Sequence, residues 1–230
     1  MTDHVQTSGR FGTAVSSDAL RNKVMRNTYW LLALSMLPTV LGAWIGVSTG
    51  ITRNLGGIVG MVLFIGGMMA FQFAIYRFRN SGAGVAILMA FTFFMGLMLS
   101  RLLGMVLGMG NGTTLVMAAF ASTAGVFFTM ATLATVIKRD LSGMGRWLFA
   151  GMIAILIAAV VNIFIGSSAM MLALTALSTL VFSLYMLYDV KNIVDGGETN
   201  YIVAATQLFI DIFAVFQNLL ALFGIMGGDD

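Results

Sequence analysis

The sequence predicts an all-α membrane protein with seven transmembrane helices. Of its 230 residues, 59% are hydrophobic and only 9% are charged, and the mean hydropathy of +0.97 lies far above the range of a water-soluble domain. Seven apolar runs follow one another, and each is near the roughly 20 residues with which a helix crosses a bilayer. The basic residues alternate between the two sides of these runs, which favours an odd number of spans.

The chain begins with a polar segment, residues 1–28, that contains the only histidine, His4. We expect this segment to be a cytoplasmic tail and residues 29–227 to form the transmembrane domain. The first apolar run, 29–48, is as long as a full span and lacks a small-residue cleavage site, so we interpret it as a retained helix rather than a signal peptide.

The six further apolar runs are expected to form helices joined by short loops. They cover residues 55–76, 83–103, 113–137, 147–166, 169–190 and 201–227. The "GSS" at residues 166–168 predicts a tight hairpin between the fifth helix and the sixth. Because the loops leave no room for a soluble domain, the function must lie in the bundle, its loops or the tail.

The distribution of lysine and arginine predicts the orientation in the membrane. In a seven-helix arrangement, two of these residues, Arg53 and Arg101, lie on one side, and ten lie on the side of the N-terminus. The ten are Arg10, Arg21, Lys23, Arg26, Arg77, Arg79, Lys138, Arg139, Arg146 and Lys191. Since cytoplasmic loops are enriched in basic residues, the N-terminus is expected in the cytoplasm and the C-terminus outside. Membrane orientation also explains the net charge of +3, so no nucleic-acid partner is predicted.

Each of the last two helices is expected to carry a polar stripe that includes an acid. At 100° per residue, Gln207, Asp211 and Asn218 fall within roughly 40° of one another on the seventh helix. The stripe on the sixth helix contains Thr175, Ser178, Tyr185 and Asp189, with Phe182 among them. Because polar faces are costly in lipid, both stripes should face the bundle interior or a water-filled path, and a central seventh helix would satisfy this.

The two acids differ in how strongly they indicate function. An acid within the membrane costs about 2.5 to 3.5 kcal/mol on insertion scales, so Asp211 points to an ion or proton pathway. Asp189 lies near the end of its helix, where solvation by water explains it equally well. Gln207 and Asn218, taken singly, are explained by helix packing. If the two acids meet, they would share a proton and titrate as a coupled pair.

Straight antiparallel helices would not bring the two acids together. Asp189 lies about six residues before the "DGG" turn at 195–197 and Asp211 about fourteen after it, a mismatch of about 12 Å in depth at 1.5 Å per residue. Contact therefore requires an irregular or obliquely packed segment over residues 198–203.

Several stretches resemble the Bax inhibitor-1 family. "VFSLYMLYDVKNI" (181–193) followed by "QLFIDIF" (207–213) is similar to the last two helices of that family, and "IVDGGETNYI" (193–202) is close to its bacterial YccA branch. "KRDLSGMGRWLFAGMI" (138–153) and "VNIFIGSSAMM" (161–171) resemble its loop between helices 4 and 5 and its hairpin between helices 5 and 6. The resemblance covers about residues 22–227.

This resemblance implies a seven-helix bundle in the bacterial inner membrane with helix 7 at its centre. Family members with the acid pair are described as pH-sensitive calcium leak channels, and the matching positions here are Asp189 and Asp211. Bacterial relatives place an arginine against that pair, for which Arg77 and Arg79 are the candidates. The YccA branch is also implicated with the membrane protease FtsH, for which residues 1–28 would be the relevant segment. A non-conducting modulator or substrate of FtsH is therefore the alternative function.

The motifs argue against an enzyme. Tyr188 and Asp189 reproduce the "YD" pair of intramembrane aspartyl proteases, but the GxGD motif is replaced by "LFID" around Asp211. No HExxH motif, phosphate loop or membrane-embedded histidine is present, and no cofactor is predicted. Two carboxylates, Asp189 and Asp211, would bind calcium only weakly and transiently, which suits conduction.

Overall fold

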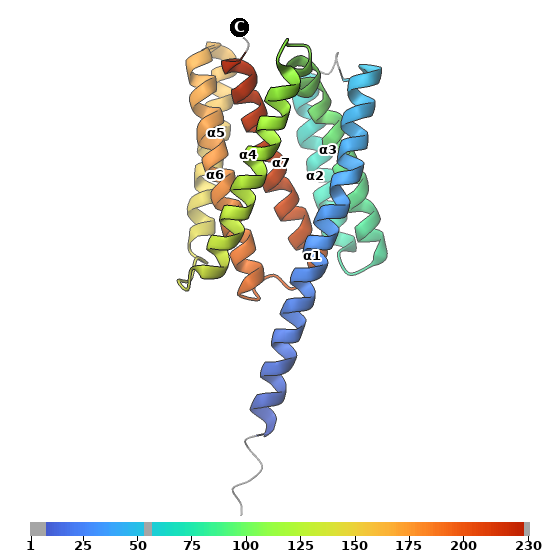
Figure 1. Ribbon diagram of the computed structural model, residues 1–230, viewed down its shortest axis with the longest axis vertical. Coiled ribbons are helices and arrows are strands. Elements are labelled where there is room, and N and C mark those ends of the chain that lie inside the picture. The colour runs from blue at the N-terminus through green and yellow to red at the C-terminus, as the bar shows by residue number, and fades with distance from the viewer. Residues whose placement is uncertain (1–7, 53–56, 228–230) are drawn as a thin grey trace, which may run out of the picture.

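The computed structural model describes residues 8–52 and 57–227, with side chains described for 19–52 and 59–227. Within these residues the chain forms seven helices and no strand (Figure 1). The helices are α1 Ser8–Thr49, α2 Gly57–Phe78, α3 Gly82–Leu107, α4 Gly112–Val136, α5 Met144–Ile165, α6 Ser168–Val194 and α7 Tyr201–Met226. All seven are long and apolar enough to cross a membrane, so the predicted fold class is confirmed. His4 and Arg53 lie outside the described residues.

The helix bounds follow the predicted apolar runs closely except at the start of α1. Every other end differs from its run by at most four residues, whereas α1 begins at Ser8, well before residue 29. The apolar pattern identifies only the part that crosses the membrane, and a helix continues through good helix formers such as Ala19, Leu20 and Lys23. The expected boundary between residues 28 and 29 therefore falls inside one continuous helix.

The two ends of the bundle are distinguished by the loops that lie there. Figure 1 shows the first part of α1 projecting beyond the other helices at one end, which we call the tail end. The loops α2–α3, α4–α5 and α6–α7 lie at the tail end. The opposite end, the hairpin end, holds the tight turn between α5 and α6, where Gly166 adopts a left-handed conformation with φ of 69°. The predicted 166–168 hairpin is thus present.

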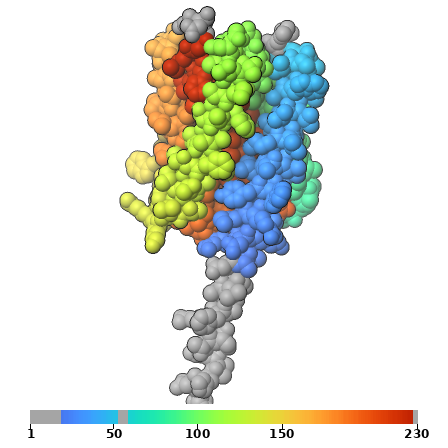
Figure 2. All heavy atoms as spheres, viewed as in Figure 1, coloured from blue at the N-terminus to red at the C-terminus, as the bar shows by residue number. Residues whose placement is uncertain are grey.

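Helix α7 packs against α1, α2, α3, α4 and α6, and its side chains form much of the core. Leu208, Val215 and Leu220 are fully buried, and the ring of Phe209 meets that of Phe91 from α3 at 5.9 Å between centroids. Figure 2 shows α1 and α4 covering most of α7 on one face. Large apolar side chains on the outside of α2, α4 and α5, including Phe73, Phe120 and Phe164, remain exposed, as expected for a surface that meets lipid.

Small residues allow α1 and α3 to approach closely. A Cβ added at Gly96 of α3 would collide with the backbone carbonyl of Thr39, and one added at Gly42 of α1 would collide with that of Phe93. Near the hairpin end, the hydroxyls of Thr52 and Ser100 hydrogen-bond at 2.7 Å. Close backbone contact at glycine is a common way for membrane helices to associate.

Candidate functional site

Asp189 and Asp211, predicted from the polar stripes, meet in the structure. A hydrogen bond joins their side chains, although they belong to different helices. Asp189 exposes 7% of its surface and Asp211 only 4%, so helix-end water does not explain Asp189. An ionised carboxyl group can only accept hydrogen bonds, so a direct bond between two carboxyls requires a proton on one of them.

The connection between α6 and α7 shows how the predicted depth mismatch is reduced. Residues 195–200 are not helical, and α7 begins only at Tyr201. Asp189 then lies five residues before the end of α6 and Asp211 ten residues after the start of α7, which leaves about 7 to 8 Å in straight helices. Because the two side chains nevertheless meet, α6 and α7 cannot pack as straight antiparallel helices with level ends. Of residues 198–203, where an irregular segment was expected, 198–200 are non-helical and 201–203 already belong to α7.

Asn200 fixes the start of α7. Its side-chain oxygen accepts hydrogen bonds from the backbone N–H groups of Ile202 and Val203, at 3.0 and 3.1 Å. Its side-chain nitrogen donates to the carbonyl oxygen of Arg79 at 2.9 Å and to Oδ1 of Asn80 at 2.8 Å. An asparagine N-cap satisfies backbone donors that a helix start leaves free. The same residue thus ties α7 to the α2–α3 loop.

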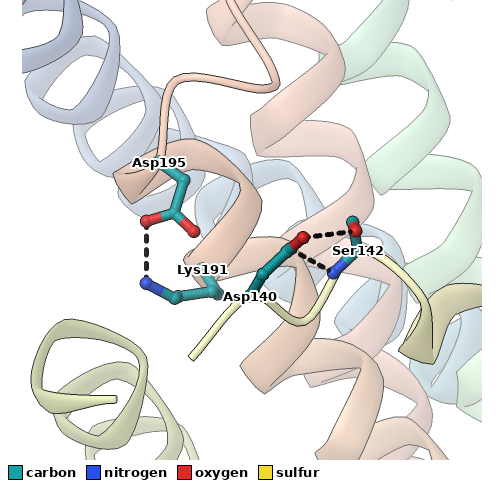
Figure 3. Close-up of polar contacts among 4 residues, drawn as sticks. All are labelled: Asp140, Ser142, Lys191 and Asp195. Atoms are coloured by element: carbon teal, nitrogen blue, oxygen red, sulfur yellow. Dashed lines mark hydrogen bonds and ion pairs between the residues drawn. The ribbon is translucent and has the colours of Figure 1, made fainter. Parts of the chain in front are cut away.

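A group of charged residues from the end of α6 and the α4–α5 loop lies at the tail end (Figure 3). Lys191 is buried, and its Nζ donates a hydrogen bond at 2.7 Å to Oδ1 of Asp195, whose side chain is more exposed. In the α4–α5 loop, Asp140 accepts hydrogen bonds from the backbone N–H and the hydroxyl of Ser142, at 2.8 and 2.9 Å. These bonds, with a smaller contribution from the charge of Lys191, lower the pKa of Asp140 below its ordinary value.

This charged group was not singled out from the sequence. Lys191 follows Asp189 by two residues, but a lysine at a helix end is explained by the positive-inside pattern alone. The spacing of Lys191 and Asp195, four residues apart on one helix, was the available signal for their pairing. No sequence pattern placed Asp140 of the α4–α5 loop near α6.

Tyr185, Ser178, Gln207 and Asn218 complete the predicted polar stripes of α6 and α7. Tyr185 lies within electrostatic range of both acids, and its ring is 6.2 Å from that of Phe182. Ser178, Gln207 and Asn218 are half-buried, and the structure gives their side chains no hydrogen-bond partner among the described residues.

The two candidate arginines are not joined to the acid pair. The guanidinium of Arg77 lies 5.9 Å from the ring centroid of Phe78, and that of Arg79 lies 5.0 Å from the ring of Tyr76. Across residues 19–52 and 59–227, no ion pair connects either arginine to Asp189 or Asp211. In this conformation the pair is held by its own hydrogen bond.

The acid pair could take part in cation binding but does not form a complete metal centre by itself. The described residues contain no cluster of three or more histidine, cysteine, aspartate or glutamate side chains suited to a metal. One oxygen of Asp211, Oδ2, is buried and accepts no hydrogen bond from an N–H group or a hydroxyl in the described structure. A buried acceptor in this state can receive a bond from water or a cation.

Comparison with known proteins places this geometry in a family. The family model described as "Inhibitor of apoptosis-promoting Bax1" matches residues 21–228. The chain belongs to the Bax inhibitor-1 family. The family resemblance inferred from the sequence is therefore confirmed, and the chain is a multi-pass membrane protein.

Relatives within the Bax inhibitor-1 family extend over almost the whole chain. An "Uncharacterized membrane protein" of Vibrio cholerae is 35% identical over 209 residues, covering 91% of this chain and 92% of that protein. The "Modulator of FtsH protease YccA" of Escherichia coli K12 is 34% identical over 227 residues, covering 99% of this chain and 100% of that protein. The "Inner membrane protein YccA" of another E. coli strain matches equally well.

Proposed function

We propose that this chain is a pH-sensitive leak path for calcium or other cations in the bacterial inner membrane. The observation that carries this proposal is the hydrogen bond between the buried side chains of Asp189 and Asp211. The packing of α7 against α1, α2, α3, α4 and α6 supports a central position for this helix. Ten lysine and arginine residues lie on the tail-end side of the helices and two on the opposite side. This difference supports a tail end that faces the cytoplasm, with residues 1–28 as its tail.

The shared proton acts as the latch between α6 and α7. A bond in which one carboxyl donates to an ionised partner is charge-assisted and stronger than a bond between neutral groups. Loss of the proton places two like charges in contact, and gain of a second proton removes the charge assistance. Either change loosens α6 from α7, so ion flux depends on pH. Tyr185 of α6 and Glu198 of the α6–α7 loop are the titratable neighbours that interact with the pair in the described structure.

A calcium ion would bind the opened pair only weakly. Calcium takes six to eight oxygen ligands, and the pair offers only two carboxyl groups. Water must supply most of the remaining ligands. Weak binding suits a path, because the ion must leave as readily as it enters.

Calcium flux into proteoliposomes tests this proposal. The native chain is expected to give flux above that of empty liposomes, with a rate that changes between about pH 6 and 8. Asp211→Asn should flatten this profile, because its amide donates to Asp189 without a titratable proton. Asp140→Asn is the matched control, since it changes an acid at the tail end that lies in the α4–α5 loop, outside the pair. Absence of flux from folded native protein at every pH would overturn the proposal.

A second candidate function is modulation of the protease FtsH without conduction. The relative named as a modulator of FtsH matches the full length of this chain, which favours this alternative. The relevant segment would be the tail, from which α1 continues into the membrane.

Deletion of residues 1–18, which precede the apolar part of α1, separates the two functions. If the chain modulates FtsH, the deletion alters the degradation rate of a membrane substrate by the protease, and Asp211→Asn leaves that rate unchanged. If neither variant changes degradation, the modulator function is wrong. If Asp211→Asn alone changes degradation, the tail is not the relevant segment.

A further inference from the structure

Three residues of the polar stripes, Thr175, Ser178 and Asn218, line a cavity at the hairpin end. It has a volume of about 470 Å³ and lies between α5, α6 and α7. Its apolar lining comes from α5 and α6, and its polar lining consists of Asn162, Ser167, Ser168, Thr175, Ser178 and Asn218. One water molecule needs only roughly 10 to 15 Å³ of such space, so the cavity can hold many.

The polar side chains in this cavity have unused hydrogen-bonding capacity. Serine and threonine in membrane helices commonly donate to the carbonyl four residues earlier, as Thr175 does to Met171 at 2.8 Å. Ser178 makes no such bond, and the amide of Asn218 on α7 has no partner in the described structure. Both side chains line the cavity from opposite helices. Two unpaired polar groups that face one roomy cavity favour water there over a lipid chain.

The cavity is in line with the acid pair. Asn218 lies seven residues after Asp211 on α7, about 10 Å along the helix. On α6, Phe182 and Tyr185 fall between Ser178 and Asp189 on the same face, and Tyr185 interacts electrostatically with both acids. This ring pair lies between the cavity and the acid pair along the stripe of α6.

A second cavity at the hairpin end is less suited to cations. It has a volume of about 220 Å³ between α2, α3 and α7, and its lining includes Thr52, Arg101 and Gln217. The fixed positive charge of Arg101 repels cations at short range, whereas the larger cavity is lined by no charged residue. The larger cavity is therefore the better entrance for cations.

We propose that the cavity between α5, α6 and α7 is a water-filled vestibule through which hydrated cations enter from the hairpin end, closed on its inner side by the rings of Phe182 and Tyr185. This inference rests on the proposed function, because it assigns an entrance to the path that Asp189 and Asp211 control. It commits to water and hydrated cations as the contents, and an acyl chain of a lipid is the competing occupant.

Thiol labelling tests the vestibule without any measurement of flux. The sequence has no cysteine, so a single introduced cysteine is the only thiol. Ser178→Cys and Asn218→Cys place thiols in the cavity, and Leu177→Cys and Leu180→Cys place them on lipid-facing positions of the same helix that are 50% and 62% exposed. Gly110→Cys at the hairpin end, where a side chain meets open space, reports full access.

Membrane-impermeant thiosulfonate reagents are then added from the side at which Gly110→Cys reacts. The attacking species is the thiolate, which requires water, so Ser178→Cys and Asn218→Cys should react at least about tenfold faster than Leu177→Cys and Leu180→Cys. A quaternary ammonium reagent should exceed a sulfonate reagent by about tenfold at the two cavity positions, relative to their ratio at Gly110→Cys, because the acids lie beyond.

The outcomes separate this inference from the proposed function. Equal, slow reaction at cavity and lipid-facing positions would mean that lipid fills the cavity, and the inference would be overturned. Fast reaction with no preference for the cationic reagent would overturn the entry of cations. Fast, cation-selective reaction in protein that gives no calcium flux would support the vestibule and count against the leak path.

Discussion

Lys191 and Asp195 form an ion pair of 2.7 Å at the end of α6, and Lys191 lies two residues beyond Asp189. The pair stabilises the last turn of the helix that presents Asp189 to α7. Because Asp195 is about half exposed, solvent screens the interaction, and its contribution to stability is expected to be about 1 kcal/mol at most.

Removal of that ion pair should therefore have a small effect. Lys191→Met keeps the apolar stem of the side chain and removes the charge, so we expect the pH profile of calcium flux to shift without becoming flat. The measurement is flux in proteoliposomes across the same pH range as for the native chain. A flat profile would show that Lys191, and not the acid pair alone, is the pH-sensing group.

Asp140 should not contribute to pH sensing near neutrality. Its hydrogen bonds to Ser142 lower its pKa in the folded chain, so it remains ionised at neutral pH. The stability that these bonds give the α4–α5 loop is fully present above the ordinary pKa of an aspartate and is lost only as pH falls through the lowered value.

We therefore expect Asp140→Asn to leave the pH dependence of flux unchanged near neutrality. Ser142→Ala, which removes only the hydroxyl donor, is the matched variant and should behave in the same way. A change of the profile in either variant, at about pH 6 to 8, would contradict the assignment of pH sensing to Asp189 and Asp211.

Gly96 should be intolerant of a side chain. Gly96→Ala forces a Cβ against the carbonyl of Thr39, so α1 and α3 must separate, at a cost of about 1 to 3 kcal/mol. Gly125→Ala in α4 is the control, because nothing lies within 4 Å of the added Cβ and alanine favours helix. Thermal unfolding in detergent should show a lower midpoint for Gly96→Ala only. Equal midpoints would refute the close α1–α3 contact.

The ring of Phe182 should limit flux. Phe182→Ala widens the passage between the vestibule and the acid pair, so we expect an increase in calcium flux of several-fold at a fixed pH. Leu180→Ala removes a similar apolar volume from a lipid-facing position and should leave flux unchanged. The measurement is the initial rate of calcium entry, normalised to folded protein. A rate for Phe182→Ala no higher than that of Leu180→Ala would exclude a barrier at this ring.

Apolar run length was sufficient to predict the number of helices and most of their bounds, because a bilayer imposes a fixed length on each span. The same signal missed the early start of α1, since helix formation does not require apolar residues. The 3.6-residue period also placed Asp211 and Asn218 on one face of α7. What it could not give is the relation between helices, which depends on packing angles.

Contact between Asp189 and Asp211 is the clearest example of this limit. Residue counting along straight helices left them too far apart, and the non-helical stretch at 195–200 reduces this difference in the folded chain. The roles of Asn200 and Asp140 depend in the same way on loops that meet only in the folded chain. Such contacts leave no periodic signal in a single sequence.

Infrared spectroscopy of the protein in lipid, at neutral pH, tests the central claim that Asp189 and Asp211 share a proton. The account predicts a carbonyl stretching band of a protonated carboxyl group in the native chain. This band should be absent in Asp211→Asn, in which the amide donates to an ionised Asp189, and absent also when both acids are replaced by asparagine. A folded native protein without the band would contradict the shared proton and, with it, the latch.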